Sequence, residues 1–274
     1  MNERIWRKSF TLSLAVLIMI AMSAAAAAAY TIDGDLDDWG VNPSSGDWIA
    51  DPPAYYVYDN WPSGPTSTES IHNPGIEQCD VEALYVADIN DSYLYFAVIL
   101  SMPPDGYVYN GVHHLIAGDL ALNMDNDDGS GEYGYEYGIK LTNDSRTVNG
   151  TIGDVFYMPD WERLNPEVAQ NCAEFSNMVS GTRTGHADVV YKLYEDWRED
   201  NEESNYVIEM RVPKSALGVT GNGTADIQAT VSCTNDVLTI EDFEYSEIPE
   251  FHTIAIPAGM ILCLFFIYRR KRQG

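Results

Sequence analysis

Short apolar stretches separated by turn residues dominate the chain after residue 80 and predict β-strands. Residues 81–87 alternate between apolar and polar positions, and residues 93–100 form a strongly apolar run. The Asn90-Asp91-Ser92 link between them is typical of a hairpin turn. Further strands of this kind are expected at 120–124, 135–141, 151–157, 189–194, 206–212 and 227–231.

Helical patterns are scarce. Residues 213–218 begin with Pro and end with Gly, which predicts one helical turn. Residues 162–180 are the one segment expected to hold a modest helix. Because no strand–helix–strand rhythm and no internal repeat occur, an α/β fold is not expected. We therefore predict an all-β fold, a single antiparallel β-sandwich with long N-terminal loops.

The region from 38 to 74 is rich in proline, which disfavours helix and central strand, so we expect a long ordered loop with one edge strand at 55–58. Its aromatic residues suggest a sugar site, because Trp and Tyr rings stack on pyranose rings while nearby carboxylates bind hydroxyls. Trp48, Tyr56 and Trp61 are the predicted platform. Packing on the sandwich edge is the alternative, and it is favoured for Trp39. A second candidate platform has alternating tyrosines, namely Tyr133, Tyr135 and Tyr137.

Both ends of the chain have the character of targeting segments. Residues 1–29 combine a basic start, an apolar stretch and an alanine tract, which predicts a cleaved signal peptide over an uncleaved helix. Residues 251–274 contain an apolar run followed by a basic tail, which predicts a C-terminal membrane helix with the tail inside the cell. The body of the protein is then displayed on the extracellular face of the cell membrane.

Pro249, Glu250 and Phe251, the apolar run and the basic cluster at the end occur in this order. Together they resemble a PEF-CTERM sorting signal of methanogenic archaea. The resemblance implies processing by an archaeosortase-like membrane enzyme and attachment to the cell surface. A plain single-pass anchor is the alternative.

Residues 30–250 contain 8 Lys and Arg against 41 Asp and Glu, a formal charge of −33. Such a surface repels nucleic acid and anionic lipid, so both are excluded as partners. It suits divalent cations or a hydrated outer face. Within this part we expect the β-sandwich ectodomain over 30–235 and an acidic linker over 236–250.

Three cysteines lie outside the apolar tail, which permits one disulfide in three pairings. We expect Cys172 to pair with Cys233, which leaves Cys79 free. Four Asn-x-Ser/Thr sequons would be surface loops of a glycoprotein. They are at Asn90, Asn143, Asn149 and Asn222.

An acidic turn follows the predicted strand at 120–124. Asn123, Asp125 and Asp127 alternate there, and Glu136 can return a further carboxylate. Calcium prefers such oxygen ligands and tolerates loose geometry, so the turn is the predicted calcium site. The alternative is an ordinary solvated turn. The acidic group from Asp33 to Asp38 is a weaker candidate.

The body resembles the family 9 carbohydrate-binding modules and DOMON-like domains in Ile32-Asp33-Gly34 with Trp39, in the hairpin at 81–100 and in the acidic turn. The resemblance implies a jelly-roll-like sandwich, structural calcium and glycan binding. The two sugar-stacking tryptophans of that family have no assigned counterparts in this chain.

Signatures of hydrolases, phosphate-binding loops and zinc sites are absent from the sequence, so no enzyme is expected. We predict a surface-anchored, calcium-stabilised carbohydrate-binding module. The alternative is a structural cell-envelope protein without a small ligand. A third reading, a haem or sugar sensor, would need axial ligands such as His113, Met124 or Met158.

Overall fold

The computed structural model describes residues 29–59, 79–90, 92–165, 173–194 and 205–246. Their strands form a five-stranded sheet of order β1-β2-β3-β11-β10, a six-stranded sheet of order β13-β12-β6-β7-β8-β9, and the ribbon β4-β5, and every pairing is antiparallel. The strands are β1 (Tyr55–Tyr58), β2 (Val81–Ala87), β3 (Tyr93–Leu100), β4 (Tyr107–Tyr109), β5 (His113–Leu115), β6 (Leu120–Asn123), β7 (Tyr137–Ile139), β8 (Asp154–Glu162), β9 (Asn177–His186), β10 (Asp188–Leu193), β11 (Tyr206–Pro213), β12 (Gly223–Thr230) and β13 (Val237–Tyr245). The three short 3₁₀ helices among these residues are η1 (Asp37–Trp39), η2 (Pro43–Ser45) and η4 (Lys214–Leu217).

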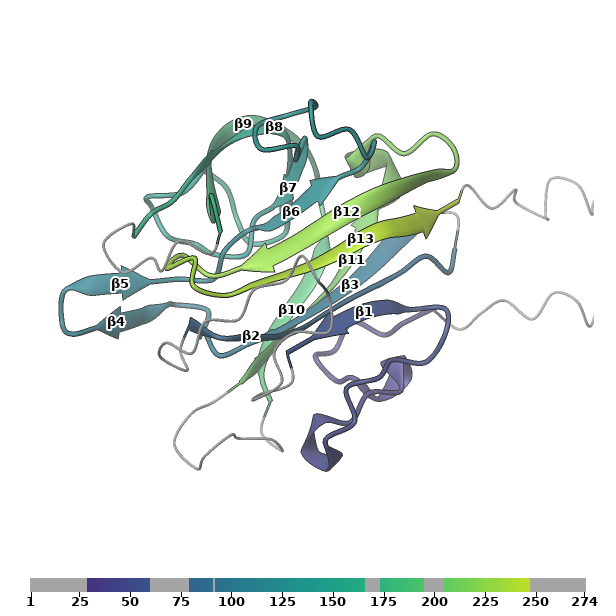
Figure 1. The fold of residues 1–274 in the computed structure, drawn as a ribbon, viewed down its shortest axis with the longest axis horizontal. Helices are drawn as coiled ribbons and strands as arrows, with labels where there is room; N and C mark the ends of the chain where they lie inside the picture. The colour runs from purple at the N-terminus through teal and green to yellow at the C-terminus, as the bar shows by residue number, and fades with distance from the viewer. Residues whose placement is uncertain (1–28, 60–78, 91, 166–172, 195–204, 247–274) are drawn as a thin grey trace, which may run out of the picture.

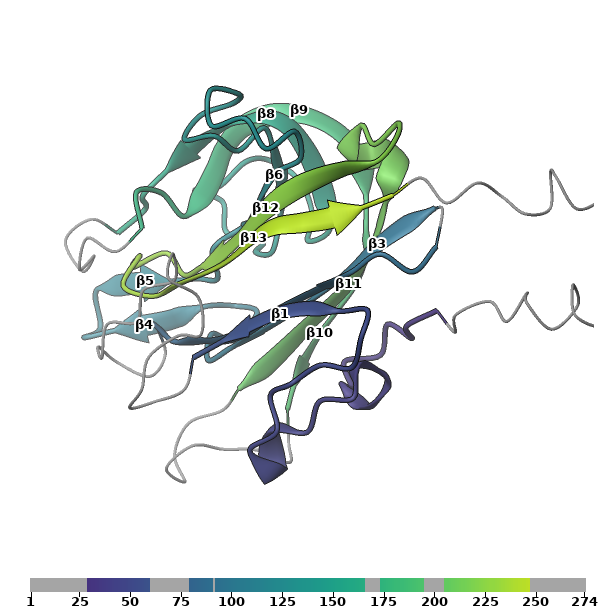
Figure 2. The same cartoon turned by 45° about the vertical axis from the view of Figure 1, so that its right-hand side comes forward.

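The two large sheets face each other as the layers of a sandwich (Figures 1 and 2). Their inner faces share one apolar core, to which β3 contributes Leu94 and Phe96 and β12 contributes Ala225 and Ile227. The all-β, sandwich-like prediction is therefore confirmed. Strands were found at 81–87, 93–100 and 55–58 as predicted, because their apolar patterns are strong enough to be recognised locally.

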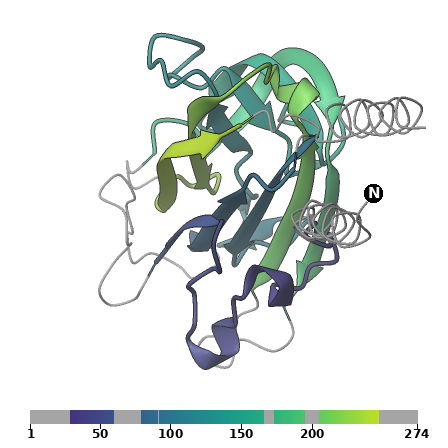
Figure 3. The ribbon, with the colours of Figure 1, turned by 90° about the vertical axis from the view of Figure 1, so that its right-hand side faces the viewer.

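The three inner strands of the five-stranded sheet, β2, β3 and β11, are buried on both faces. On β3, Leu94 and Phe96 point into the sandwich core, whereas Tyr95 and Ala97 belong to a second apolar cluster on the outer face. The N-terminal segment of residues 30–54 covers that outer face and forms a third layer (Figures 2 and 3). This double burial explains why β2 and β3 are almost continuously apolar in sequence.

A buried glutamate on β11 holds the N-terminal segment. Glu209 Oε1 accepts a hydrogen bond from Trp39 Nε1 (2.8 Å), and Oε2 accepts from the backbone N–H groups of Asp33 (2.9 Å) and Gly34 (3.0 Å). Trp39 is fully buried and stacks on Tyr30, with ring centroids 4.1 Å apart. Gly34 has φ +75°, and a Cβ there would approach Lys192 to 2.9 Å. The Asp-Gly…Trp motif therefore has a structural role: Asp33, Gly34 and Trp39 attach the N-terminal segment to Glu209 of β11, and we call these contacts the clasp. Trp39 packs on the sheet as expected.

The outer face of the six-stranded sheet carries a smaller apolar cluster, which consists of Ala121, Val148, Phe156, Trp161, Phe175 and Met178. Gly138 on β7 lies beneath it. A Cβ at that position would collide with Met178 Sδ and lie 2.8 Å from the Trp161 ring. The missing side chain therefore allows this cluster to pack directly on the sheet.

Two expectations about the chain path need correction, and one element was missed. Most of the expected acidic linker over 236–250 is β13, which pairs with β12 and buries Phe243 in the core, so the sandwich extends past residue 235. The helix expected within 162–180 is wrong where the structure describes it, because Asn177–His186 form β9 on the edge of the six-stranded sheet. The ribbon β4-β5 was not predicted.

The described chain leaves the sandwich beside a buried ion pair. Lys214 Nζ lies 2.7 Å from Asp88 Oδ1, and both side chains are about 95 % buried. Asp88 also accepts a hydrogen bond from the Ser246 N–H (2.7 Å), and Lys214 donates to the Ser246 carbonyl (2.5 Å). The last described residue is thereby fixed to the sandwich.

No helix in the part of the chain that the structure describes is long and apolar enough to cross a membrane. The expected signal peptide at 1–29 (all but its last residue), the membrane helix within 251–274 and the motif Pro249-Glu250-Phe251 lie outside the described residues.

Candidate functional site

A row of three aromatic rings lies at the edge of the outer face of the five-stranded sheet. The rings of Trp48 and Tyr58 are 6.4 Å apart with planes inclined by 15°, and those of Tyr58 and Tyr56 are 6.2 Å apart with planes inclined by 20°. All three side chains are partly exposed. We call Trp48, Tyr56 and Tyr58 the aromatic row. Near-parallel rings at these distances stack on one another, and together they form one partly exposed aromatic surface.

The sequence positions this row from two directions. Tyr56 and Tyr58 alternate along β1, so both point to the same face of the sheet. Trp48 comes from the N-terminal segment, and its backbone carbonyl accepts a hydrogen bond from the Tyr85 hydroxyl on β2 (3.1 Å). Asp47, the residue before Trp48, is exposed, and its charge contributes to the raised pKa of Tyr85, which is due mainly to burial.

Two of the three predicted platform residues, Trp48 and Tyr56, are therefore brought together, whereas Trp61 lies outside the described residues. Tyr58 was not assigned to the platform, although its alternation with Tyr56 could have identified it. The second candidate platform is not a single row. Tyr133 stacks on Phe175, and Tyr137 packs against Tyr157.

The predicted calcium turn is a compact loop that is ordered largely by its own side chains. Asn123 Oδ1 and Asp125 Oδ1 both accept hydrogen bonds from the Asp127 N–H (3.2 and 3.1 Å), and Asp127 Oδ1 accepts from the Gly129 N–H (2.9 Å). Such Asx contacts are typical of a turn that needs no ion. Asp125 and Asp127 are exposed, whereas Asn123 is buried.

Glu136 is the unusual member of this turn. Its side chain is 4 % exposed, and Oε1 accepts a hydrogen bond from the Met124 N–H (2.7 Å). Its Oε2 is buried and has no hydrogen-bond partner among the described residues. Burial raises the pKa of Glu136 to about 7, and the nearby charge of Asp125 adds to the shift. The carboxylate oxygens of Asp125, Asp127 and Glu136 do not all lie within 4.8 Å of one another in this structure.

Three other aspartates gather more closely. Asp59, Asp80 and Asp236 each offer a carboxylate oxygen, and these oxygens lie within 4.8 Å of one another; no other group of three such ligands was found in the described chain. They come from the end of β1 and from the residues just before β2 and β13. Burial and the charge of Asp80 raise the pKa of Asp236. Only the sandwich topology brings these residues together, so the sequence pattern could not indicate the cluster.

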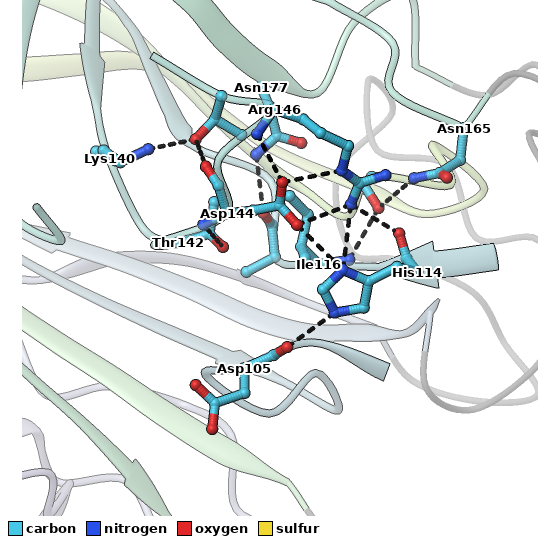
Figure 4. A network of polar contacts seen from close by, with 12 residues as sticks. Asp105, His114, Ile116, Lys140, Thr142, Asp144, Arg146, Asn165 and Asn177 are labelled. Carbon is cyan, nitrogen blue, oxygen red and sulfur yellow. Dashed lines mark hydrogen bonds and ion pairs between the residues drawn. The ribbon is translucent and has the colours of Figure 1, made fainter. Parts of the chain in front are cut away.

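The histidines of the described chain are engaged in structural contacts. His114 Nδ1 lies 3.1 Å from Asp144 Oδ2, and its Nε2 lies 2.9 Å from the carbonyl oxygen of Asp105 (Figure 4). Arg146 binds the same Asp144 carboxylate and donates to the His114 carbonyl (2.9 Å). With both ring nitrogens occupied, His114 ties β5 to the loop after β7. His186 Nδ1 similarly contacts Asp154 (2.9 Å).

The three residues considered as haem ligands lie in different surroundings. Met124 is buried in the apolar core, whereas Met158 is an exposed residue of β8. His113 lies on the short strand β5.

Of the sequons, Asn143, Asn149 and Asn222 are exposed, as surface loops require. Asn90 is different because its amide is already used. Nδ2 donates to the Tyr95 hydroxyl (2.8 Å), and Oδ1 accepts from the N–H groups of Ser92 and Tyr93. A glycan at Asn90 would disrupt this hairpin turn.

Comparison with known proteins identifies one region. Residues 248–272 match the PEF-CTERM archaeal protein sorting domain. No curated protein and no solved structure shows significant similarity to the chain. The predicted PEF-CTERM sorting signal is confirmed, and it implies a surface-anchored protein processed by an archaeosortase-like enzyme. The resemblance of the ectodomain to family 9 carbohydrate-binding modules receives no support from these comparisons.

Proposed function

We propose that the protein is a non-catalytic module on the extracellular face of the cell membrane that binds glycans of the cell envelope or of its surroundings. The single observation that carries this proposal is the aromatic row. Its rings are near-parallel and partly exposed, and the exposed residue Asp47 directly precedes Trp48 in the chain. Stacking on the apolar face of a sugar ring and accepting hydrogen bonds from its hydroxyls need this combination.

The geometry supports a binding surface that is formed in advance. The Tyr85 hydroxyl holds the Trp48 carbonyl, and β1 fixes both tyrosines in register with β2. Binding would therefore lose little side-chain conformational entropy, which favours affinity. Burying one aromatic side chain against a sugar is worth about 1.5–3 kcal/mol, so loss of either ring lowers affinity at least about tenfold.

The test is a glycan array probed with the purified protein, in calcium and again with a chelator. Saturable binding to one glycan class is expected, with loss of binding in Trp48→Ala and in Tyr58→Ala. Tyr157→Ala is the matched control, because Tyr157 is a 39 % exposed tyrosine on the other sheet. Absence of binding by the folded protein on a broad array would refute the proposal and favour the structural cell-envelope role.

Calcium is part of the same proposal. Glu136 and Asp125 would hold the ion at the acidic turn, with Asn123 and Asp127 as further oxygen donors; calcium takes about six to eight oxygen ligands. The ion would neutralise the buried carboxylate and fix the turn. The orphaned Oε2 of Glu136 supports this site.

Thermal unfolding with calcium and with chelator tests the ion, and Glu136→Gln tests its place. We expect calcium to raise the melting temperature of the wild-type protein and to have little effect on the variant. Chelator-insensitive melting would exclude calcium. If calcium still stabilises the Glu136→Gln variant, the ion binds somewhere other than this turn.

A further inference from the structure

Two buried thiols meet where the chain enters β2 and where it turns between β12 and β13. Cys79 and Cys233 are each 2 % exposed and belong to the sandwich core. Val81 N–H donates to Asp236 Oδ2 (2.6 Å), so the segments that carry the two cysteines run side by side. The Cys79 thiol lies in hydrogen-bond contact with that of Cys233. Both are reduced cysteines in this structure.

From this geometry we propose that Cys79 and Cys233 form a disulfide in the exported protein. The bridge would join the five-stranded sheet to the six-stranded sheet through β2 and the β12–β13 turn. This pairing differs from the one expected from the sequence, Cys172 with Cys233, in which Cys172 lies outside the described residues. It is independent of the proposed glycan site, because no residue of the aromatic row takes part.

The chemistry is a thiol–disulfide exchange. Before the sandwich closes, one of the two thiols loses its proton and attacks a disulfide carrier on the outer side of the membrane, which gives a mixed disulfide and releases one carrier thiol. The other protein thiol then displaces the second carrier thiol. In balance, two protein thiols lose two protons and two electrons, and the carrier disulfide gains them as two thiols.

Both thiols are buried in the folded protein, so a carrier can reach them only before this part of the sandwich closes. In the folded protein, Cys233 Sγ lies 2.6 Å from Asn235 Oδ1. The extracellular location that the sorting domain implies is the kind of compartment in which disulfides persist. Burial in the folded protein would protect the completed bridge from reductants.

The experiment is differential alkylation of the full chain after export. The protein is unfolded in acid, labelled with light N-ethylmaleimide, reduced, labelled with heavy N-ethylmaleimide and digested for mass spectrometry. We expect the heavy label on Cys79 and Cys233, and a reducible peptide pair that contains both. The light label on these two residues, or a linked peptide that joins Cys233 to Cys172, would overturn the proposal.

Two variants extend the test without depending on a stable fold. In Cys79→Ser, Cys233 should change from the heavy label to the light label; continued protection of Cys233 would contradict the pairing. Cys172→Ser is the matched control and should leave the bridge intact. In the wild-type protein, reductant should open the bridge only when denaturant is added, and the reduced form should melt at a lower temperature.

Discussion

Replacing Trp39 by Phe removes one hydrogen-bond donor from the clasp between the N-terminal segment and β11. The indole Nε1 donates to Glu209 Oε1 at 2.8 Å, and both residues are fully buried. The Phe ring would keep the stacking contact with Tyr30, which now has ring centroids 4.1 Å apart. The variant therefore isolates a buried hydrogen bond to a carboxylate.

The size of the effect follows from the charge of the acceptor. A hydrogen bond to a charged group contributes about 1.5–3 kcal/mol, whereas a neutral one contributes about 0.5–1.5 kcal/mol. Trp161→Phe is the matched control, because Trp161 is also buried and its Nε1 donates to the neutral carbonyl of Tyr135 at 3.3 Å. Both variants leave a cavity of similar size. With Glu209 ionised, we expect Trp39→Phe to lower the free energy of unfolding by about 1–2 kcal/mol more than Trp161→Phe does.

The destabilisation caused by Trp39→Phe should depend on pH, because Glu209 titrates. Burial raises the pKa of Glu209 from 4.5 to about 7 in the folded protein, despite the hydrogen bonds that lower it. The folded state therefore binds more protons than the unfolded state between these values, and the stability contributed by Glu209 is lost as the pH rises from 4.5 through 7. Because the carboxylate is ionised only above about pH 7, the cost of Trp39→Phe should grow across that pH.

Urea unfolding followed by circular dichroism measures the effect, since this signal does not depend on the mutated indole. The free energy of unfolding should be determined at pH 5 and pH 8.5 for the wild-type protein and both variants. Equal losses for Trp39→Phe and Trp161→Phe at both pH values would refute the role assigned to Glu209.

Three further predictions concern packing, a buried ion pair and the acidic turn. Gly138→Ala forces a Cβ into Met178 and should lower the free energy of unfolding by about 1–3 kcal/mol, as measured in urea. Lys214→Met leaves Asp88 buried without its cation and should cost about 3–5 kcal/mol, whereas the double variant with Asp88→Leu should recover most of this loss. Without calcium, the free energy of unfolding should fall as the pH rises from 4.5 through 7, in part because the pKa of Glu136 is raised to about 7 in the folded protein. Glu136→Gln should flatten this part of the pH profile in a series of thermal melts. An unchanged profile would contradict the role assigned to Glu136.

The strands that the sequence predicted well are those whose burial is visible locally. β2 and β3 are covered on both faces, so their apolar runs stand out. β9 lies on the edge of its sheet and is mostly exposed, which removes the apolar alternation and leaves only the pairing with β8 to define it. In β13, exposed Glu241 and Asp242 interrupt the apolar pattern and made the segment resemble a linker.

The candidate sites divide in the same way. Tyr56 and Tyr58 lie two residues apart on one strand, and the acidic turn is a local structure, so both features can be recognised in the sequence. The contact between Trp39 and Glu209 joins residues 170 positions apart. The cluster of Asp59, Asp80 and Asp236 likewise depends on which strands become neighbours. Local patterns do not contain that information.

The most direct test of the account is isothermal titration of the intact protein with the glycan class selected on the array. The wild-type protein should bind with measurable heat and a defined stoichiometry. The Trp48→Ala/Tyr58→Ala variant should lose at least about a hundredfold in affinity, because two stacking surfaces are removed. Unchanged affinity in this variant, with Tyr157→Ala as the control, would show that the aromatic row is not the binding surface.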